Sequence, residues 1–299
     1  MSEKGHRVGH ALFLGFRNLI KLLPRKACLT LGSMLGRMVY CFDKKHREIA
    51  LKNLHIAFGE EMPASEKKRL AQCSFEHFGK ALFDTLKFSS LTEEKKEALL
   101  SIDGEEHIRN ALDKGKGVLL LTAHYGNWEL GIIPLSKLGE FYVIARALDI
   151  DRFENELLSI REGFGAKVIY KQQAARHTLR ALRENRIVAI LIDQNVLHDE
   201  AVFVDFFGKL AGTTPGLATF HLRSGAPIIP AFCMPTPSGG YHVQIMEGLE
   251  FSLTGDRNTD VFRITQECTK TIEDQIRDTP SLWLWFHDRW RTQPNIQGI

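Results

Sequence analysis

The stretch that decides the fold covers residues 115–130 and reads GKGVLLLTAHYGNWEL. Its apolar run Val118–Thr122 follows two glycines and is typical of a short strand buried on both faces. His124 lies in the turn after this strand, where open α/β sheets bind their ligands. Gly126 permits a tight turn there, and Asn127 is a suitable N-cap for a following helix. The pattern therefore predicts a strand, a turn that carries His124, and a helix.

Similar apolar runs recur along the chain, and segments with helical periodicity separate them. The runs cover residues 141–145, 167–169, 187–192 and 228–232, with an alternating run at 241–246. The helical segments include residues 65–88, 152–164, 174–184 and 259–278. Strands that alternate with helices in this way predict an α/β fold, with a central, mostly parallel, mixed sheet covered by helices on both faces.

The N-terminal residues follow a different pattern. Residues 8–23 place apolar side chains at helical spacing, and Pro24 ends that segment. Residues 27–42 form a second apolar stretch, which is shorter than the roughly 20 residues of a spanning helix. The two segments therefore predict amphipathic helices rather than a transmembrane segment.

The charge of the N-terminal region indicates what these helices contact. Residues 1–52 contain 11 Lys or Arg against 3 Asp or Glu, whereas the remaining residues carry a small acidic surplus. Such a surplus favours an anionic membrane surface. We expect residues 1–42 to anchor a single domain, residues 43–299, at the membrane; two ordinary helices that cover the core are the alternative. The spacing of Gly32 and Gly36 also permits a close helix contact.

Missing motifs exclude several classes of protein. The chain shows no recognisable nucleic-acid-binding module, so we expect no nucleic-acid partner. The five cysteines form no C-x-x-C pair, which indicates reduced thiols on the cytosolic side of a membrane. The 12 histidines lack metal-ligand spacing, so we expect no metal. A nucleophile elbow and a phosphate-binding loop are also missing, which argues against a serine hydrolase and a nucleotide-binding enzyme.

His124 and Glu129 are the residues most suited to chemistry. A spacing of five does not place two residues on one helical face, but a histidine in the preceding turn can be reached by Glu129. Histidine can remove a proton from an alcohol near neutral pH, and a carboxylate fixes its tautomer and stabilises the imidazolium. A structural histidine–acid pair is the alternative.

The stretch around His124 resembles the H-x4-D/E motif of the glycerolipid acyltransferase superfamily, and specifically the late acyltransferases of lipid A biosynthesis. The shared residues there are His124, Gly126, Asn127, Trp128 and Glu129. Further matching blocks follow in order at residues 47–54, 57–58, 146, 161 and 165, 193–195, 206–208, 213–214, 224–227, and 285, 287, 289 and 290. A lone H-x4-E would be weak, but this ordered series covers most of the chain.

The resemblance implies an O-acyltransferase without a cofactor, in which His124 is the general base and Glu129 its catalytic partner. The acyl donor would be a thioester on acyl carrier protein, with acyl-CoA as the alternative. The acceptor would be a hydroxyl of a lipid A precursor at the cytoplasmic face of the bacterial inner membrane. The resemblance also implies a set of substrate-binding residues: Asn127, Arg146, Arg161, Asp193, Thr213, Thr214 and Arg289.

Several of these residues could instead have a purely structural role. Arg146 could form a surface salt bridge, and Asp193 could orient a second basic residue or cap a turn. Thr213 and Thr214 could bind a polar headgroup or cap the helix that begins near Pro215.

The chain departs from the family pattern at a few positions, and these bear on the acceptor. Ala147 stands where the family usually has proline, and residues 150–151 read Ile-Asp where Asn-Pro is expected. Asn195 and Trp290 replace an aspartate and a phenylalanine that are common there. Two other functions therefore stay open. One is an acyltransferase for another lipid, such as a lysophospholipid, an aminolipid or a glycosylated phosphatidylinositol. The other is a non-catalytic lipid-binding protein, which would tolerate the loss of His124.

Overall fold

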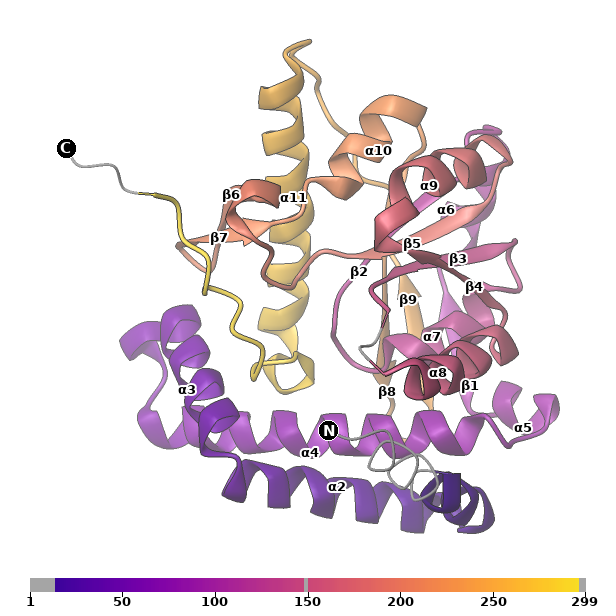
Figure 1. Ribbon diagram of the computed structural model, residues 1–299, viewed down its shortest axis with the longest axis vertical. Coiled ribbons are helices and arrows are strands. Elements are labelled where there is room, and N and C mark those ends of the chain that lie inside the picture. Colours follow the sequence, from indigo (N-terminus) through magenta and orange to yellow (C-terminus); the bar gives the residue numbers. More distant parts are fainter. Residues whose placement is uncertain (1–13, 148–149, 296–299) are drawn as a thin grey trace.

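The computed structural model describes residues 14–147 and 150–295 (Figure 1). Its main sheet contains β1 (Leu100–Asp103), β2 (Val118–Thr122), β3 (Phe141–Ala145), β4 (Ala166–Tyr170), β5 (Ile187–Leu191), β8 (Ile228–Pro235) and β9 (Tyr241–Ile245). The strand order is β1-β9-β8-β2-β5-β3-β4. Neighbouring strands pair in parallel, except for the antiparallel pair β8–β9. The predicted α/β class with a mostly parallel mixed sheet is confirmed.

Strands β2 and β5 lie in the middle of the sheet, and all of their residues except Thr122 are apolar. Leu119 of β2 lies between Val188 of β5 and Ile228 of β8. All of β2 is buried, as expected for a parallel strand with helices on both faces. The residues that follow β2 and β5 therefore reach the same edge of the sheet from adjacent strands.

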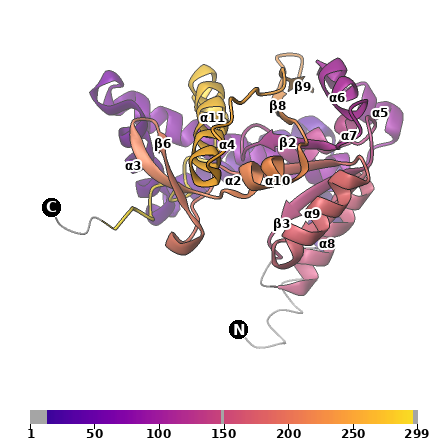
Figure 2. The ribbon, with the colours of Figure 1, turned by 90° about the horizontal axis from the view of Figure 1, so that it is seen from above.

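Helices cover both faces of this sheet. Side chains of successive residues point to opposite faces of a strand, and Leu119 and Leu120 accordingly belong to two different core clusters. The cluster with Leu119 includes side chains of α9 (Ala174–Arg183), α10 (Gly216–Ser224) and α11 (Arg257–Asp278). The cluster with Leu120 includes α6 (Glu105–Leu112), α7 (Trp128–Leu135) and α8 (Asp151–Gly163). Helices α10 and α11 lie beside each other (Figure 2).

A second, smaller sheet lies beside α11. It is the antiparallel pair β6 (Val202–Phe206) and β7 (Lys209–Thr213), which contacts α11. This hairpin was not predicted from the sequence. The remaining chain, after a short turn at Pro280–Leu282, turns back from the end of α11 and passes beside β7 (Figure 1).

The N-terminal helices pack on the body of the protein. Residues 14–22 are helical and are followed by α2 (Arg25–Phe42), α3 (Lys44–Phe58), α4 (Ala64–Phe88) and the short α5 (Glu93–Glu97). Figure 1 shows α2 running alongside α4. A Cβ atom on Gly32 would lie 2.5 Å from the carbonyl oxygen of Gly79, and one on Gly36 would lie 2.1 Å from that of Phe75. The predicted close helix contact is therefore confirmed.

The outer side of α2 is apolar and exposed. The exposed side chains recur at helical spacing: Leu31, Met34, Met38 and Phe42. Phe42 is 84% exposed, and Leu22 in the preceding helical segment is 83% exposed. Within residues 14–147 and 150–295, none of the helices has both the length and the apolar content needed to cross a bilayer. Residues 1–13, part of the predicted anchor, lie outside the described residues.

Candidate active site

The loop that carries His124 is held on several sides by backbone hydrogen bonds. Leu284 N–H donates to the carbonyl oxygen of His124 at 3.2 Å, and Gly126 N–H donates to that of Leu282 at 2.9 Å. Asn127 N–H donates to the carbonyl oxygen of Cys233 at 2.9 Å. The loop is thus fixed between β8 and the segment after α11.

Gly126 is required at its position by both conformation and space. Its φ of 61° lies in the left-handed region, which glycine adopts without strain. A Cβ atom there would lie 1.9 Å from the carbonyl oxygen of Cys233. Any other residue would push the His124 loop away from β8.

His124 is paired with a carboxylate from the neighbouring strand. Asp193 follows β5, which lies next to β2, and its Oδ1 accepts a hydrogen bond from His124 Nδ1 at 2.9 Å. The expectation that Glu129 reaches the ring is therefore corrected: the carboxylate bonded to the imidazole is Asp193. The reason is the sheet order, which brings the ends of β2 and β5 together although 69 residues separate the two side chains.

The Asp193 carboxylate is buried and ionised. Its Oδ2 accepts hydrogen bonds from His124 N–H at 2.9 Å and from Trp283 Nε1–H at 2.8 Å. Burial alone would raise the pKa of Asp193, but His124 and these N–H donors outweigh that effect and lower it. Because the carboxylate accepts from Nδ1–H, the imidazole keeps its lone pair on Nε2. The His124 side chain is 21% exposed and that of Asp193 only 1%. The imidazole is therefore accessible from solvent, while the carboxylate bonded to it is buried.

Glu129 forms a separate ion pair at the same loop. It lies in the first turn of α7, and its Oε2 and Oε1 accept from Nε and Nη2 of Arg161 on α8 at 3.0 and 2.5 Å. Trp128 Nε1–H also donates to Glu129 Oε1 at 3.2 Å. Burial alone would lower the pKa of Arg161, but the Glu129 carboxylate raises it above its ordinary value. Two residues singled out from the sequence, Glu129 and Arg161, are thus brought into contact.

An aromatic wall extends from His124 toward α4. The ring centroids of His124 and Trp128 lie 4.9 Å apart, and those of Trp128 and Phe78 lie 5.9 Å apart. Phe78 also contacts Phe286, with centroids at 5.5 Å. Leu82, one turn further along α4, is half exposed. This apolar, partly accessible surface beside the imidazole suits a hydrocarbon chain.

The side-chain amide of Asn127 forms hydrogen bonds within the protein. Its Oδ1 accepts from Leu130 N–H at 3.3 Å, which confirms the predicted N-cap of α7. Oδ1 also accepts from the Thr85 hydroxyl at 3.2 Å, and Nδ2 donates to the carbonyl oxygen of Ala81 at 3.4 Å. The buried amide therefore ties the His124 loop to α4.

The other residues implied to bind substrate are distributed around the same edge. Arg146 follows β3 and is exposed. Arg289 is fully buried; its guanidinium donates to the carbonyl oxygen of Gly212 at 2.6 Å and to the hydroxyl of Thr213. Thr214 Oγ1 accepts from Gly216 N–H at 3.3 Å in the turn that leads into α10, whose N-cap is Pro215.

Three supporting residues were missed by the sequence analysis. His77 on α4 donates from Nε2 to the carbonyl oxygen of Gly126 at 2.9 Å. Ser74, one turn earlier, donates its hydroxyl hydrogen to the carbonyl oxygen of Trp283 at 2.6 Å. Trp283 itself holds Asp193. Single polar residues on an amphipathic helix carry no sequence signal, whereas Trp283 stands two residues before the recognised Trp285.

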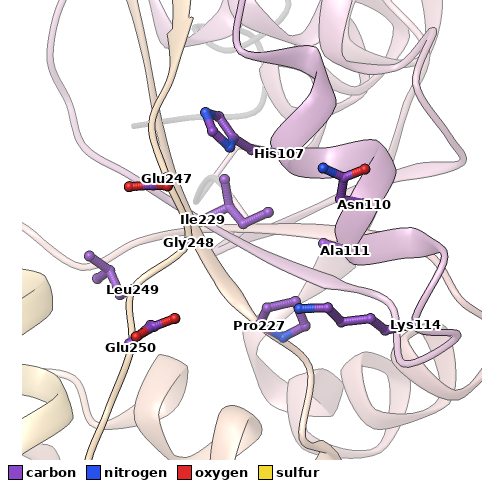
Figure 3. Close-up of a pocket in the computed structure, with 10 residues that line it drawn as sticks. All are labelled: His107, Asn110, Ala111, Lys114, Pro227, Ile229, Glu247, Gly248, Leu249 and Glu250. Atoms are coloured by element: carbon purple, nitrogen blue, oxygen red, sulfur yellow. The ribbon is translucent and has the colours of Figure 1, made fainter.

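A separate groove lies at the opposite edge of the sheet. It has a volume of about 500 Å³, and Pro227 contributes to its lining. Since β8 runs parallel to β2, a residue that precedes β8 lies at the edge away from His124. Figure 3 shows its polar groups on two sides: His107, Asn110 and Lys114 from α6 and the segment after it, and Glu247 and Glu250 after β9.

Comparisons with known proteins identify the family of the chain. The chain matches the model of the bacterial lipid A biosynthesis acyltransferase family over residues 4–292. It is 26% identical over 288 residues to the lipid A biosynthesis lauroyltransferase of Escherichia coli (strain K12), covering 95% of this chain and 91% of that protein. It is 24% identical over 278 residues to the lipid A biosynthesis palmitoleoyltransferase of the same strain, covering 91% and 87%.

A relative with a different acceptor in its name is similar at the same level. The chain is 26% identical over 246 residues to the phosphatidylinositol mannoside acyltransferase of Mycobacterium tuberculosis (strain CDC 1551 / Oshkosh), covering 80% of this chain and 75% of that protein. The fold and these relatives define an acyltransferase that acts on lipids. More particularly, the chain belongs to the bacterial lipid A biosynthesis acyltransferase family.

Proposed function

We propose that this enzyme transfers a fatty acyl group from an acyl thioester to a hydroxyl of a lipid A precursor, with His124 as general base. The observation that carries the proposal is the accessible imidazole bonded to the buried carboxylate of Asp193. Lipid A is favoured over a phosphatidylinositol mannoside because the lauroyltransferase match covers 95% of the chain and the mannoside match 80%. Acyl carrier protein is the donor we favour, with acyl-CoA as the alternative.

The reaction needs only one proton carrier. His124 Nε2 accepts the proton of the acceptor hydroxyl as its oxygen attacks the thioester carbonyl carbon. The carbon–oxygen bond forms, the carbon–sulfur bond breaks, and the imidazolium returns the proton to the departing thiolate. Asp193 stabilises the imidazolium in between, because its buried carboxylate carries the opposite charge. The chain has no nucleophile elbow, so the transfer is direct and no acyl-enzyme forms.

Arg161 and Arg146 serve the anionic groups of the reactants. Glu129 holds Arg161 beside the His124 loop with two guanidinium bonds. A planar guanidinium can bind a phosphate or the oxyanion of the transition state, and Arg146 at the end of β3 can do the same. Glu129 thus contributes to catalysis by fixing Arg161 rather than by contacting the imidazole.

The apolar side of α2 supports a position of the enzyme at the cytoplasmic face of the bacterial inner membrane. Met34, Met38 and Phe42 would enter the headgroup region, while the basic residues of the N-terminal region attract anionic lipid. The aromatic wall from Phe78 to Trp128 connects α4, against which α2 packs, with His124.

The decisive experiment compares His124→Ala with His107→Ala, a histidine at the opposite edge. Acyl transfer is measured by mass spectrometry with dodecanoyl–acyl carrier protein, dodecanoyl-CoA, under-acylated lipid A and phosphatidylinositol mannoside in all combinations. We expect His124→Ala to lose about 10²–10⁴-fold in activity, since that is the usual contribution of a general base, and His107→Ala to keep it. Near wild-type turnover in a folded His124→Ala protein would overturn His124 as the general base, whereas no acyl transfer by the wild type from either donor would leave the non-catalytic lipid-binding function standing.

The membrane contact is tested separately by flotation with vesicles that contain phosphatidylglycerol. The variant M34S/M38S/F42S should bind more weakly than the wild type, because each change removes apolar surface from the bilayer. Leu253→Ser, an exposed leucine outside the helices, is the matched control. Equal flotation of the triple variant and the wild type would contradict the anchor.

A further inference from the structure

We infer that Trp283 is a positioning residue, whose indole N–H fixes the Asp193 carboxylate and, through it, the imidazole of His124. The inference rests on the proposed function of His124 as general base. It adds a residue that lies 90 positions from Asp193 in the chain and that touches no reacting atom.

The two oxygens of Asp193 have different tasks. Oδ1 accepts from His124 Nδ1 at 2.9 Å and is the atom that orients the ring. Oδ2 accepts from His124 N–H at 2.9 Å and from Trp283 Nε1–H at 2.8 Å. Two donors on Oδ2 stop the carboxylate from rotating about its Cβ–Cγ bond, and Oδ1 therefore keeps its place. Without the indole donor, the backbone N–H of His124 would have to hold Oδ2 alone.

Trp283 is itself held independently of Asp193, so its N–H is a fixed reference point. Its side chain is 1% exposed, and its ring packs edge-on against Trp285 with centroids 4.7 Å apart. The Phe206 ring contacts it with centroids 5.5 Å apart. The backbone carbonyl of Trp283 accepts from the Ser74 hydroxyl at 2.6 Å, which ties it to α4. Because Trp283 is fixed by these contacts, its N–H restricts the rotation of the Asp193 carboxylate and does not move with it.

The segment after α11 provides matched controls. Trp285 is as deeply buried as Trp283, but its Nε1–H donates to the carbonyl oxygen of Pro280 at 2.6 Å. Trp290 is 2% exposed, and among the described residues its Nε1 has no hydrogen-bond partner. Three buried indoles in one cluster thus differ in what the N–H contacts. Replacing each by phenylalanine removes the same group and some of the same packing.

The test measures kcat and KM for Trp283→Phe, Trp285→Phe and Trp290→Phe, using the full chain with dodecanoyl–acyl carrier protein and under-acylated lipid A. We expect Trp283→Phe to lower kcat about tenfold, as one positioning hydrogen bond suggests, with KM within about twofold. The two control variants should keep kcat near the wild-type value, although thermal melts will show that all three are less stable. The His124 Nδ1–H proton resonance should move only in Trp283→Phe.

A second substitution removes the effect of lost packing. 3-Benzothienylalanine at position 283 keeps the bicyclic shape and replaces the N–H by sulfur, so it should reproduce the tenfold loss of kcat. Equal losses of kcat at positions 283 and 285, or full kcat with the benzothienyl group, would overturn the inference. His124→Ala is measured alongside. If that variant is inactive while the tryptophan variants do not differ, only the role of Trp283 fails; if it is active, the proposed function fails.

Discussion

The two edges of the central sheet carry similar side chains in very different surroundings. At the edge where β2 and β5 end, His124 is bonded to Asp193, and Glu129 is bonded to Arg161. At the opposite edge, a groove presents His107 and Lys114 across from two glutamates that are both exposed (Figure 3). The groove has a volume of about 500 Å³, yet within the residues that the structure describes its charged groups are not bonded to a buried partner of the kind that fixes His124.

The difference shows that a site is recognised by the support of its residues more than by their types. A catalytic group must be held close to its productive geometry, and packing with secondary hydrogen bonds provides that restraint. Asp193 receives three hydrogen bonds from His124 and Trp283, and it is 1% exposed. We therefore place the chemistry at the His124 edge, although the histidines and carboxylates at both edges are equally suited to it.

The largest effect should come from Asp193→Asn, compared with Glu247→Gln in the opposite groove. The amide keeps the shape of the carboxylate but cannot stabilise an imidazolium, and it can hold the ring in the wrong tautomer. We expect activity to fall by about 10²–10⁴-fold at a similar melting temperature, and no change for Glu247→Gln. Comparable losses in both variants would remove the distinction between the two edges.

The next largest effect should come from Gly126→Ala, which acts on the support of the His124 loop. The new Cβ would lie 1.9 Å from the Cys233 carbonyl oxygen, so the loop must shift. Gly115 has a similar φ of 69° but has nothing within 4 Å, which makes Gly115→Ala the matched control. Chemical denaturation should show a loss of about 3 kcal/mol or more for Gly126→Ala and about 1–2 kcal/mol for Gly115→Ala. The same loss in both would mean that the contact with β8 is unimportant.

A smaller effect on activity is expected for the ion pair of Glu129. Glu129→Gln leaves Arg161 partly buried without its counter-charge, and we expect a loss of about 10- to 100-fold. Arg161→Met and the double variant should lose about as much as either change alone, because the pair acts as a unit. Glu184→Gln, which breaks an exposed ion pair with Arg180, is the control and should change nothing. If the losses of activity in the two single variants add up in the double variant, Glu129 has a role that is independent of Arg161.

The smallest effect concerns the contribution of His77 to the pH dependence of the free energy of unfolding. Burial lowers the pKa of His77 to about 4, although its bond to the Gly126 carbonyl opposes the shift. Between pH 6.5 and about 4 the unfolded chain therefore takes up a proton that the folded chain does not, so stability falls as the pH falls through this window. Glutamine can donate the same bond and does not titrate.

Urea denaturation at pH 7 and pH 4.5 measures this contribution. His77→Gln should unfold near the wild-type midpoint at pH 7 and lose less stability at pH 4.5. Part of the loss should remain, because burial also lowers the pKa of His287 to about 4. An identical loss in the variant and the wild type would show that His77 does not titrate in this way.

Local patterns were sufficient to predict most of the elements. The apolar runs at β2, β5 and β8 identify buried strands because a strand covered on both faces is apolar at nearly every position. Asn127 was recognised as a cap because capping depends on a neighbouring backbone N–H only. The hairpin of β6 and β7 was missed because its pattern is short and half exposed.

The pairing of charges at the site could not be predicted from spacing. Glu129 is five residues from His124, whereas Asp193 is 69 residues away, so proximity in the chain favours the wrong partner. The correct pairing depends on the strand order, which places β5 rather than β3 beside β2. Such an order arises from packing of the whole sheet and leaves no trace near either residue.

The segment that holds the His124 loop from outside has a consequence for the biosynthesis of the enzyme. Trp283 and Leu284 leave the ribosome long after His124, and 90 residues after Asp193. Domains generally fold from the N-terminus during synthesis, and contacts between distant residues form slowly. A nascent chain that already contains the whole H-x4-E motif therefore still lacks the donor that fixes Asp193. The enzyme becomes competent only when nearly all of its chain has been translated, and a product cut short before Trp283 would contain the motif without activity.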